Sequence, residues 1–68
     1  MLLKILDRQV EGDEHGLYHL QALGQEASGL FEQAKLEHRA SFQDHEGRHY
    51  ILTRESPGHY LVAHSDSL

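Results

Sequence analysis

The segment from Leu30 to His64 constrains the fold most, because apolar and polar side chains alternate along it and two turn signals interrupt it. A period of two is typical of a strand with one buried face, since successive side chains of a strand point to opposite sides of the sheet. The interruptions are Asp44-His45-Glu46-Gly47 and Ser56-Pro57-Gly58, both rich in residues that form tight turns. The pattern therefore predicts three consecutive antiparallel strands, over 30–43, 48–54 and 59–64.

Glycine marks the boundaries of five strand-length runs. The six glycines and the one proline fall in four clusters, and each cluster separates two runs that are long enough for a strand. A chain of 68 residues has room for a single small domain, 1–68, with one modest core. The sequence therefore predicts a mainly β fold, which is a small antiparallel five-strand meander or barrel-like sheet.

The stretch 17–38 also permits a helix. Between Leu17 and Ala40 there is no Val, Ile or Thr, and good helix formers predominate. Against a helix, each glycine within it would destabilise it by about 1 kcal/mol. The apolar residues that share one side of such a helix, at spacings of three and four, are Leu20, Leu23, Ala27, Leu30, Phe31 and Ala34. The alternative fold is therefore α+β, with one helix near 25–38 packed on a three- to four-strand antiparallel sheet.

Turn chemistry predicts a register for the last three strands. The first turn suits a type I turn followed by a left-handed Gly47, which is the usual bulged hairpin. The second turn, with its Pro-Gly pair, connects the next two strands directly. The predicted pairs are Phe42 with Tyr50, Ala40 with Leu52, Leu52 with Leu61, and Tyr50 with Ala63. These six residues form the predicted core face.

The opposite face of the same strands is too apolar, taken as a whole, to be left wholly in water. Either the first strands of the chain cover this face by closing a barrel, or a second protein covers it. Self-association is the form of the second alternative that we expect, because a chain of this size sits near the stability margin and oligomerisation is one remedy. The predicted interface residues are Ser41, Ile51, Tyr60 and Val62.

Seven histidines are the unusual feature of the composition. The predicted register sets His49 opposite His64, with His45 nearby in the turn. Three converging imidazoles bind zinc, copper or nickel. The three residues are therefore the candidate metal ligands, although polar strand faces also carry histidine without any ligand, and the main expectation is that the protein has no cofactor.

Charge and the length of the apolar runs argue against two classes of partner. The net charge is −5 and the basic residues are dispersed, so that we expect no nucleic-acid binding. The apolar start of the chain is too short for a signal peptide or a membrane span, so that we expect a cytoplasmic protein that binds no membrane.

Four acidic residues crowd the first turn region: Asp7, Glu11, Asp13 and Glu14. They form either a docking patch for a basic partner or a solvated loop that keeps the protein soluble.

Catalytic patterns are not found in the sequence. It contains no cysteine, and its serines lie outside any Gly-x-Ser-x-Gly elbow. A chain this short seldom forms a cleft that desolvates two carboxylates. The sequence therefore predicts a small acidic non-enzymatic protein-interaction module, for example an inhibitor or accessory factor, that acts as a homodimer. The alternative is a histidine-based metal or haem binding protein.

Overall fold

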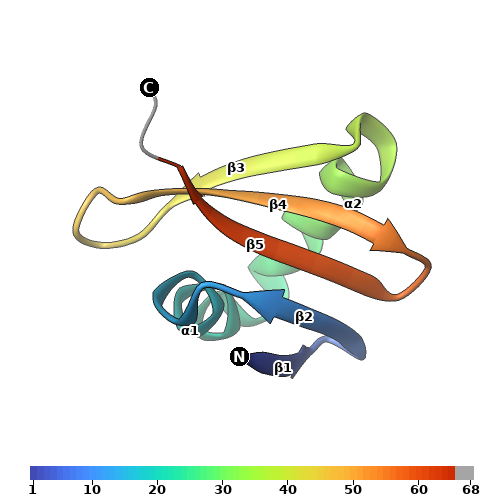
Figure 1. Cartoon of the computed structure of the whole chain (residues 1–68), viewed down its shortest axis with the longest axis horizontal. Coiled ribbons are helices and arrows are strands. Elements are labelled where there is room, and N and C mark those ends of the chain that lie inside the picture. Colours follow the sequence, from blue (N-terminus) through green and yellow to red (C-terminus); the bar gives the residue numbers. More distant parts are fainter. Residues whose placement is uncertain (66–68) are drawn as a thin grey trace.

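The computed structural model describes residues 1–65 and shows a five-strand mixed sheet with a helical segment on one side (Figure 1). The strands are β1 (Leu2–Ile5), β2 (Arg8–Gly12), β3 (Arg39–Gln43), β4 (His49–Ser56) and β5 (His59–Ser65). The helical segment consists of α1 (Glu14–Leu23) and α2 (Ala27–Glu37), joined by a 3₁₀ turn (Gly24–Glu26). The strand order is β1-β2-β5-β4-β3, and all neighbours are antiparallel except β2 and β5, which are parallel.

This α+β architecture corrects the mainly β prediction. A sheet of five strands is present, but it is neither an antiparallel meander nor a closed barrel, because β1 and β3 form its two edges. The alternative prediction of a helix on a sheet is closer. It nevertheless predicted one helix near 25–38 and an antiparallel sheet, whereas the helical segment begins at Glu14 and the sheet contains a parallel pair.

The helical segment forms where the apolar spacing of three and four is satisfied by burial. Leu17, Leu20, Phe31 and Ala34 are all fully buried against the sheet. Asp13 caps the first helix, since its side chain accepts a hydrogen bond of 3.0 Å from the backbone N–H of Gly16. The burial of this stripe outweighs the unfavourable helix propensity of the glycines.

The predicted strand over 30–43 is therefore wrong for its first part. The alternating pattern there also satisfies helical spacing, as Leu30 and Ala34 are four residues apart. Leu36, which the alternation assigned to the buried side, is 68% exposed on α2. The helix ends at His38, whose left-handed backbone (φ 74°) reverses the chain into β3.

The predicted register is confirmed for β3 and β4 and wrong by one residue for β4 and β5. Phe42 pairs with Tyr50, and Ala40 pairs with Leu52, as predicted. In contrast, Leu52 pairs with Val62 rather than with Leu61, and Tyr50 pairs with His64 rather than with Ala63. An irregularity in β4 between Arg54 and Ser56 inserts the extra residue. A slip of one residue turns every side chain of a strand to the other face. The side chains of β5 therefore lie on the face opposite to the one that the sequence predicted.

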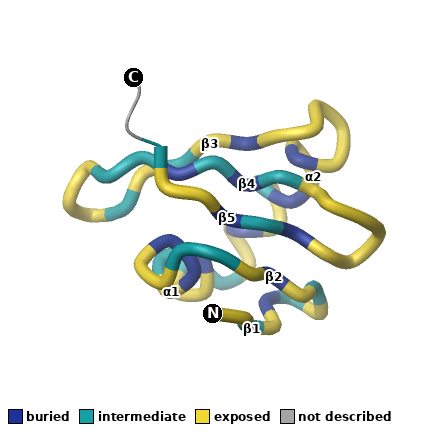
Figure 2. Tube along the Cα trace, in the orientation of Figure 1, coloured by how far each residue is buried: buried dark blue, intermediate teal, exposed yellow. Residues whose placement is uncertain are grey.

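The core lies between the sheet and the two helices. The helix α1 packs against β1, β2 and β5, and α2 packs against β3 and β4, so that both helices cover the same face (Figure 1, Figure 2). Gly16 allows the close approach of α1, because a Cβ atom at this position would lie 2.6 Å from Cγ1 of Val62. We call the side of the sheet that the two helices cover the covered face, and the opposite side the open face.

Candidate interaction surface

The open face presents side chains from all five strands in register. One row across the sheet reads Leu2, Glu11, Leu61, Thr53 and Arg39, on β1, β2, β5, β4 and β3 respectively. A second row lies beside it and reads Ala63, Ile51 and Ser41. The two rows bring together the aliphatic side chains of this face.

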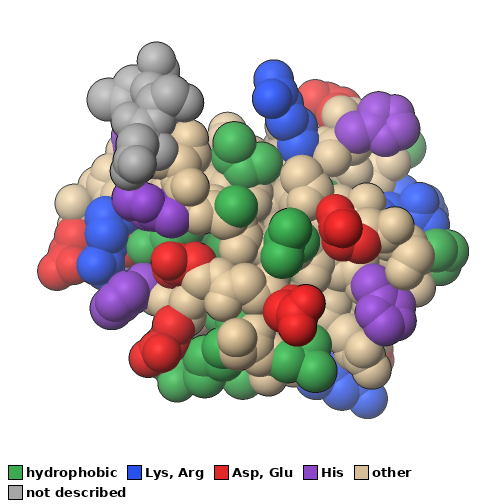
Figure 3. Space-filling view, in the orientation of Figure 1, with side chains coloured by type: hydrophobic (Ala, Val, Ile, Leu, Met, Phe, Trp, Pro, Cys, Tyr) green, Lys and Arg blue, Asp and Glu red, His purple; other side chains and the backbone are tan. Residues whose placement is uncertain are grey.

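The middle of the open face is apolar and only half covered. Ile51 and Leu61 are of intermediate exposure and Ala63 is exposed, and the three lie on the two central strands, β4 and β5. Figure 3 shows hydrophobic side chains in the middle of this face with charged side chains around them. Aliphatic side chains on adjacent strands that no helix covers form a surface suited to a second protein.

Two residues of the first row carry opposite charges. Glu11 lies on β2 and Arg39 lies on β3, with Leu61 and Thr53 between them. Three strand spacings of about 4.8 Å separate the two charged residues by about 14 Å. Glu11 therefore lies on one side of the apolar middle and Arg39 on the other.

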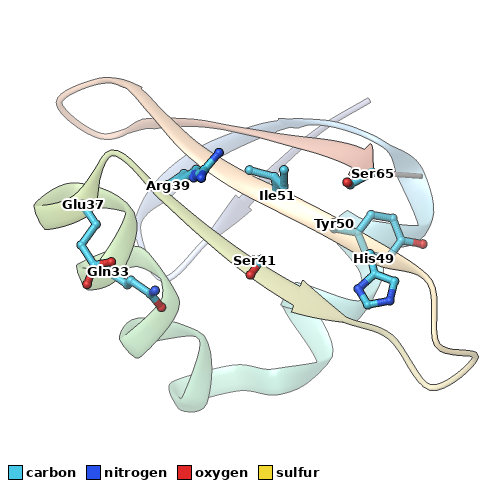
Figure 4. Close-up of a pocket in the computed structure, with 8 residues that line it drawn as sticks. All are labelled: Gln33, Glu37, Arg39, Ser41, His49, Tyr50, Ile51 and Ser65. Atoms are coloured by element: carbon cyan, nitrogen blue, oxygen red, sulfur yellow. The ribbon is translucent and has the colours of Figure 1, made fainter. Parts of the chain in front are cut away.

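A hollow of about 670 Å³ lies at the unpaired edge of β3 (Figure 4). Its sheet side includes Arg39, Ser41 and Ile51, and its helix side consists of Gln33 and Glu37 from α2. This hollow continues the open face around the edge strand. It adds polar side chains of both charges to the rim of the apolar middle, as is typical of interaction surfaces.

The structure divides the four predicted interface residues between the two faces. Ser41 and Ile51 lie on the open face. Tyr60 and Val62 are core residues, 6% and 1% exposed, so their prediction as interface residues is wrong. The one-residue irregularity in β4 is the reason, because it turns Tyr60 and Val62 towards the helices. The same irregularity turns Leu61 and Ala63 to the open face, where the sequence argument missed them.

The three predicted metal ligands do not converge. His49 pairs with Ser65 and lies on the open face, where its ring is 3.2 Å from the Nε2 atom of Gln43. His64 is on the covered side, with its ring 5.5 Å from that of Tyr50. Among residues 1–65, no three His, Asp or Glu side chains are grouped so as to hold a metal ion. The metal site predicted at His45, His49 and His64 is therefore wrong, because it depended on the register that pairs His49 with His64.

The predicted acidic patch is likewise dispersed. Asp7 lies in the tight turn between β1 and β2, whereas Asp13 caps α1 at the other end of β2. The six residue-to-residue steps from Asp7 to Asp13 run along β2 and separate the two by about 20 Å. Glu11 faces the open side and Glu14 lies in the first turn of α1, so the four carboxylates do not form one surface.

The loop between β3 and β4 is organised by Asp44. Its Oδ1 atom accepts hydrogen bonds from the backbone N–H groups of Glu46 and Arg48, both at 2.9 Å. Its Oδ2 atom accepts hydrogen bonds from Nε of Arg48 at 2.6 Å and from the hydroxyl of Tyr50 at 3.0 Å. The carboxylate thereby fixes the loop to the buried ring of Tyr50.

The same contacts shift the pKa values of three groups. Burial alone would raise the pKa of Asp44, but the hydrogen bonds from Arg48, Tyr50 and Glu46 outweigh it and hold that pKa well below its ordinary value. The hydrogen bond to Asp44 raises the pKa of Arg48. Burial, together with the hydrogen bond to Asp44, raises the pKa of Tyr50. These shifts belong to a structural network, and all three groups keep their ordinary charge at neutral pH.

Comparison with known proteins does not assign the chain to a family. No protein-family model matches the sequence, and neither the curated proteins nor the solved structures contain a match. Within residues 1–65, no helix is long and apolar enough to cross a membrane.

Proposed function

We propose that the protein is a non-enzymatic protein-interaction module that acts as a homodimer, in which the open faces of two sheets pack against each other. The observation that carries this proposal is the row Glu11, Leu61, Thr53 and Arg39, in which Leu61 and Thr53 lie between two residues of opposite charge. Such a row is complementary to a second copy of itself.

The symmetry of this row defines one arrangement of the two copies. A two-fold axis that runs parallel to the strands, between the sheets and over the boundary of β4 and β5, lays β2 of one copy over β3 of the other. Glu11 then faces Arg39 of the other copy twice, while Leu61 faces Thr53 and Ile51 faces Ala63. Two sheets packed in this way lie about 10 Å apart, which is the usual spacing of a β-sandwich.

The size of the molecule is compatible with this interface. The chain has an accessible surface of 4435 Å² and measures 28 × 22 × 21 Å. A stable interface buries about 800 Å² per partner, which is about a fifth of this surface. One face of a five-strand sheet provides such an area in a molecule of these dimensions. The burial of Ile51, Leu61 and Ala63 would supply the main favourable free energy of association.

The test compares two leucines on opposite sides of the molecule. Leu61→Asp places a charge in the middle of the open face, whereas Leu36→Asp places the same charge on the exposed side of α2. We expect the original chain and Leu36→Asp to sediment as a dimer of about 15.6 kDa, twice the mass of one chain, and Leu61→Asp to sediment as a monomer of 7.8 kDa. Circular dichroism checks that both variants remain folded.

Two results would count against the proposal. If the original chain is monomeric at millimolar concentration, the protein does not self-associate and the proposal is wrong. A dimer that Leu36→Asp dissociates and Leu61→Asp does not would assign the interface to the helices instead of the sheet.

A further inference from the structure

The two edges of the sheet differ in how they are protected from other strands. An edge strand exposes unpaired backbone groups, and native proteins commonly shorten such a strand or place lysine or proline on it. The edge strand β1 has four residues, one of which is Lys4. The edge strand β3 has five residues, contains neither lysine nor proline, and pairs with β4 in a regular register without a bulge. The edge of β3 is therefore the one that is better suited to accept a further strand.

The backbone of β3 directs hydrogen-bonding groups to its free edge. In an antiparallel pair, residues that bond to the partner strand alternate with residues whose N–H and C=O point away from it. Asp44 is a bonded residue, since its N–H donates to the carbonyl oxygen of Arg48 at 3.1 Å. By alternation, Ala40 and Phe42 also bond to β4. The N–H and C=O of Ser41 therefore point away from β4, to a side where no strand of the described part of the chain lies.

The hollow of about 670 Å³ at this edge has a helix as its second wall. Figure 4 shows Gln33 and Glu37 on α2, with Ser41 on the neighbouring strand. The volume lies within the range of ligand sites, about 300–1,000 Å³. A segment that pairs with β3 would run about 4.8 Å from it, and every second side chain of that segment would point to the covered face, where α2 lies. The hollow therefore has room for an extended segment between the strand and the helix.

The helix side of the hollow is negative. Glu37 is exposed and makes no ion pair among residues 1–65. It is also the last residue of α2, where the unpaired carbonyl groups of a helix carry a partial negative charge. Lys35 is two positions away and so lies on nearly the opposite side of the helix, and Arg39 lines the hollow from the open face. A basic side chain of an added segment would therefore complement Glu37, and the net charge of −5 favours the same sign.

We propose that β3 binds an extended segment of another protein as a sixth strand of the sheet, with a lysine or arginine of that segment beside Glu37. Hydrogen bonds to the outward backbone groups of Ser41 supply the affinity, and the contact with Glu37 supplies the preference for a basic segment. Strand addition to an exposed sheet edge is an established mode of peptide recognition. The proposed site goes beyond the homodimer, because it uses the edge of β3 and not the open face.

The experiment measures the binding of three synthetic peptides to the full chain by fluorescence anisotropy. The first is a labelled eight-residue peptide in which valine and threonine alternate around a central lysine, because these two residues favour strands. The second has glutamate in place of the lysine, and the third is the first with N-methyl groups on its four central backbone nitrogens. We expect the second to bind about fivefold more weakly than the first, because it replaces an attractive pair by a repulsive one. We expect the third to bind at least about tenfold more weakly, because it cannot donate to β3.

Two variants test the same contacts from the side of the protein. Glu37→Gln should abolish the preference for lysine over glutamate. Ser41→Pro removes the outward N–H and should weaken the first peptide about tenfold, while proline is tolerated at such an edge position and circular dichroism checks the fold. Lys4→Pro is the matched control on the other edge. The carbonyl of Met1 accepts a hydrogen bond from the N–H of Gly12, so that by alternation the N–H of Lys4 also points outward, and this variant should bind like the original chain.

The proposal is overturned if the first peptide does not bind with a Kd below about 1 mM. It is also overturned if the N-methylated peptide binds as well as the first, or if Glu37→Gln keeps the preference for lysine. Sedimentation of Ser41→Pro tests the remaining occupant of the edge. We expect its mass to equal that of the original chain, and a mass of half that value would show that a second copy occupies the edge of β3 instead.

Discussion

The two faces of the single sheet differ in what covers them. On the covered face, Val10, Leu52 and Val62 are at most 1% exposed and lie under the two helices. On the open face, Ile51 and Leu61 are only half-buried, although they are direct chain neighbours of two of those core residues. Alternate residues of the same strands thus belong to two surfaces that differ in exposure.

Under the proposed function, the covered face stabilises the fold and the open face mediates association. The covered face adds ring contacts to its aliphatic packing, since Phe31 packs edge-on against Tyr60 at 4.8 Å and Arg8 lies over the same Phe31 ring. The open face lacks a covering layer within residues 1–65, and its first row carries Glu11 on β2 and Arg39 on β3. Substitutions at neighbouring positions should therefore affect different properties.

The largest expected effect separates Leu52 from Ile51. Leu52→Ala removes a fully buried side chain and should lower the free energy of unfolding by about 2–5 kcal/mol. Ile51→Ala, one residue away on the open face, should lower it by less than about 1 kcal/mol in the monomer and should instead weaken self-association. Urea unfolding at low protein concentration measures the first quantity, and sedimentation measures the second. Equal losses of stability in both variants would remove the distinction between the faces.

Gly16 and Gly29 give the next largest contrast. In Gly16→Ala the new methyl group would meet Cγ1 of Val62 at 2.6 Å and the ring of Tyr50 at 2.9 Å, which should destabilise the protein by about 1–3 kcal/mol. In Gly29→Ala nothing lies within 4 Å, so the better helix propensity of alanine should stabilise α2 by about 0.5–1 kcal/mol. Thermal unfolding of both variants checks the two signs. A stabilising Gly16→Ala would show that α1 does not approach the covered face as closely as described.

A smaller effect concerns the pH dependence of stability. The pKa of Asp44 is lower in the folded protein than in the unfolded chain, so its contribution is fully present above the unfolded pKa of about 3.9 and is lost as the pH falls through the folded pKa. The urea midpoint should therefore fall below pH 4 in the original chain and should fall less in Asp44→Asn. Measurements between pH 2.5 and 7 make this comparison. If the urea midpoints of the original chain and of Asp44→Asn fell in parallel with pH, the Asp44 carboxylate would not be what anchors Tyr50 to the loop.

The β3–β4 hairpin was the part of the fold that the sequence predicted best. Its turn contains Asp44 and Gly47, whose roles are local: Asp44 accepts hydrogen bonds from within the loop, and Gly47 takes a left-handed backbone with φ 79°. Local turn chemistry sets the register of a hairpin, so the pairs of Phe42 and Ala40 followed from it.

The main prediction missed the helices because a glycine has more than one use, although the alternative placed a helix near 25–38, where α2 lies. Gly16 was interpreted as a turn residue, but it allows α1 to pack closely on Val62. Gly24 ends α1, and Gly29 is tolerated inside α2. The first hairpin was missed for the opposite reason, because its two-residue turn, Leu6-Asp7, contains no glycine and adopts positive φ angles without one.

The candidate surface could be predicted only in part, because it depends on one residue in β4. Ser41 and Ile51 were assigned to the side that the structure leaves open. Tyr60 and Val62 were assigned to that side too, and the irregularity before Ser56 reverses them. The parallel pairing of β2 with β5, which brings Glu11 beside Leu61, joins segments far apart in sequence, and no local pattern indicates it.

The central claim is that the open faces of two copies pack with Glu11 against Arg39, and two charge reversals test it together. Glu11→Arg and Arg39→Glu each replace two attractive pairs by two repulsive ones, which should weaken the dimer by about tenfold or more if each pair changes by about 1 kcal/mol. A mixed dimer of the two variants restores both pairs. Within one chain the two residues are about 14 Å apart, so only contact between copies explains such a rescue.

The decisive measurement is native mass spectrometry of the two variants, alone and in an equal mixture, at a concentration where half of the original chain is dimeric. We expect each variant alone to be mainly monomeric and the mixture to form a heterodimer of about 15.6 kDa. A mixture that stays monomeric, or variants that each dimerise as well as the original chain, would contradict it.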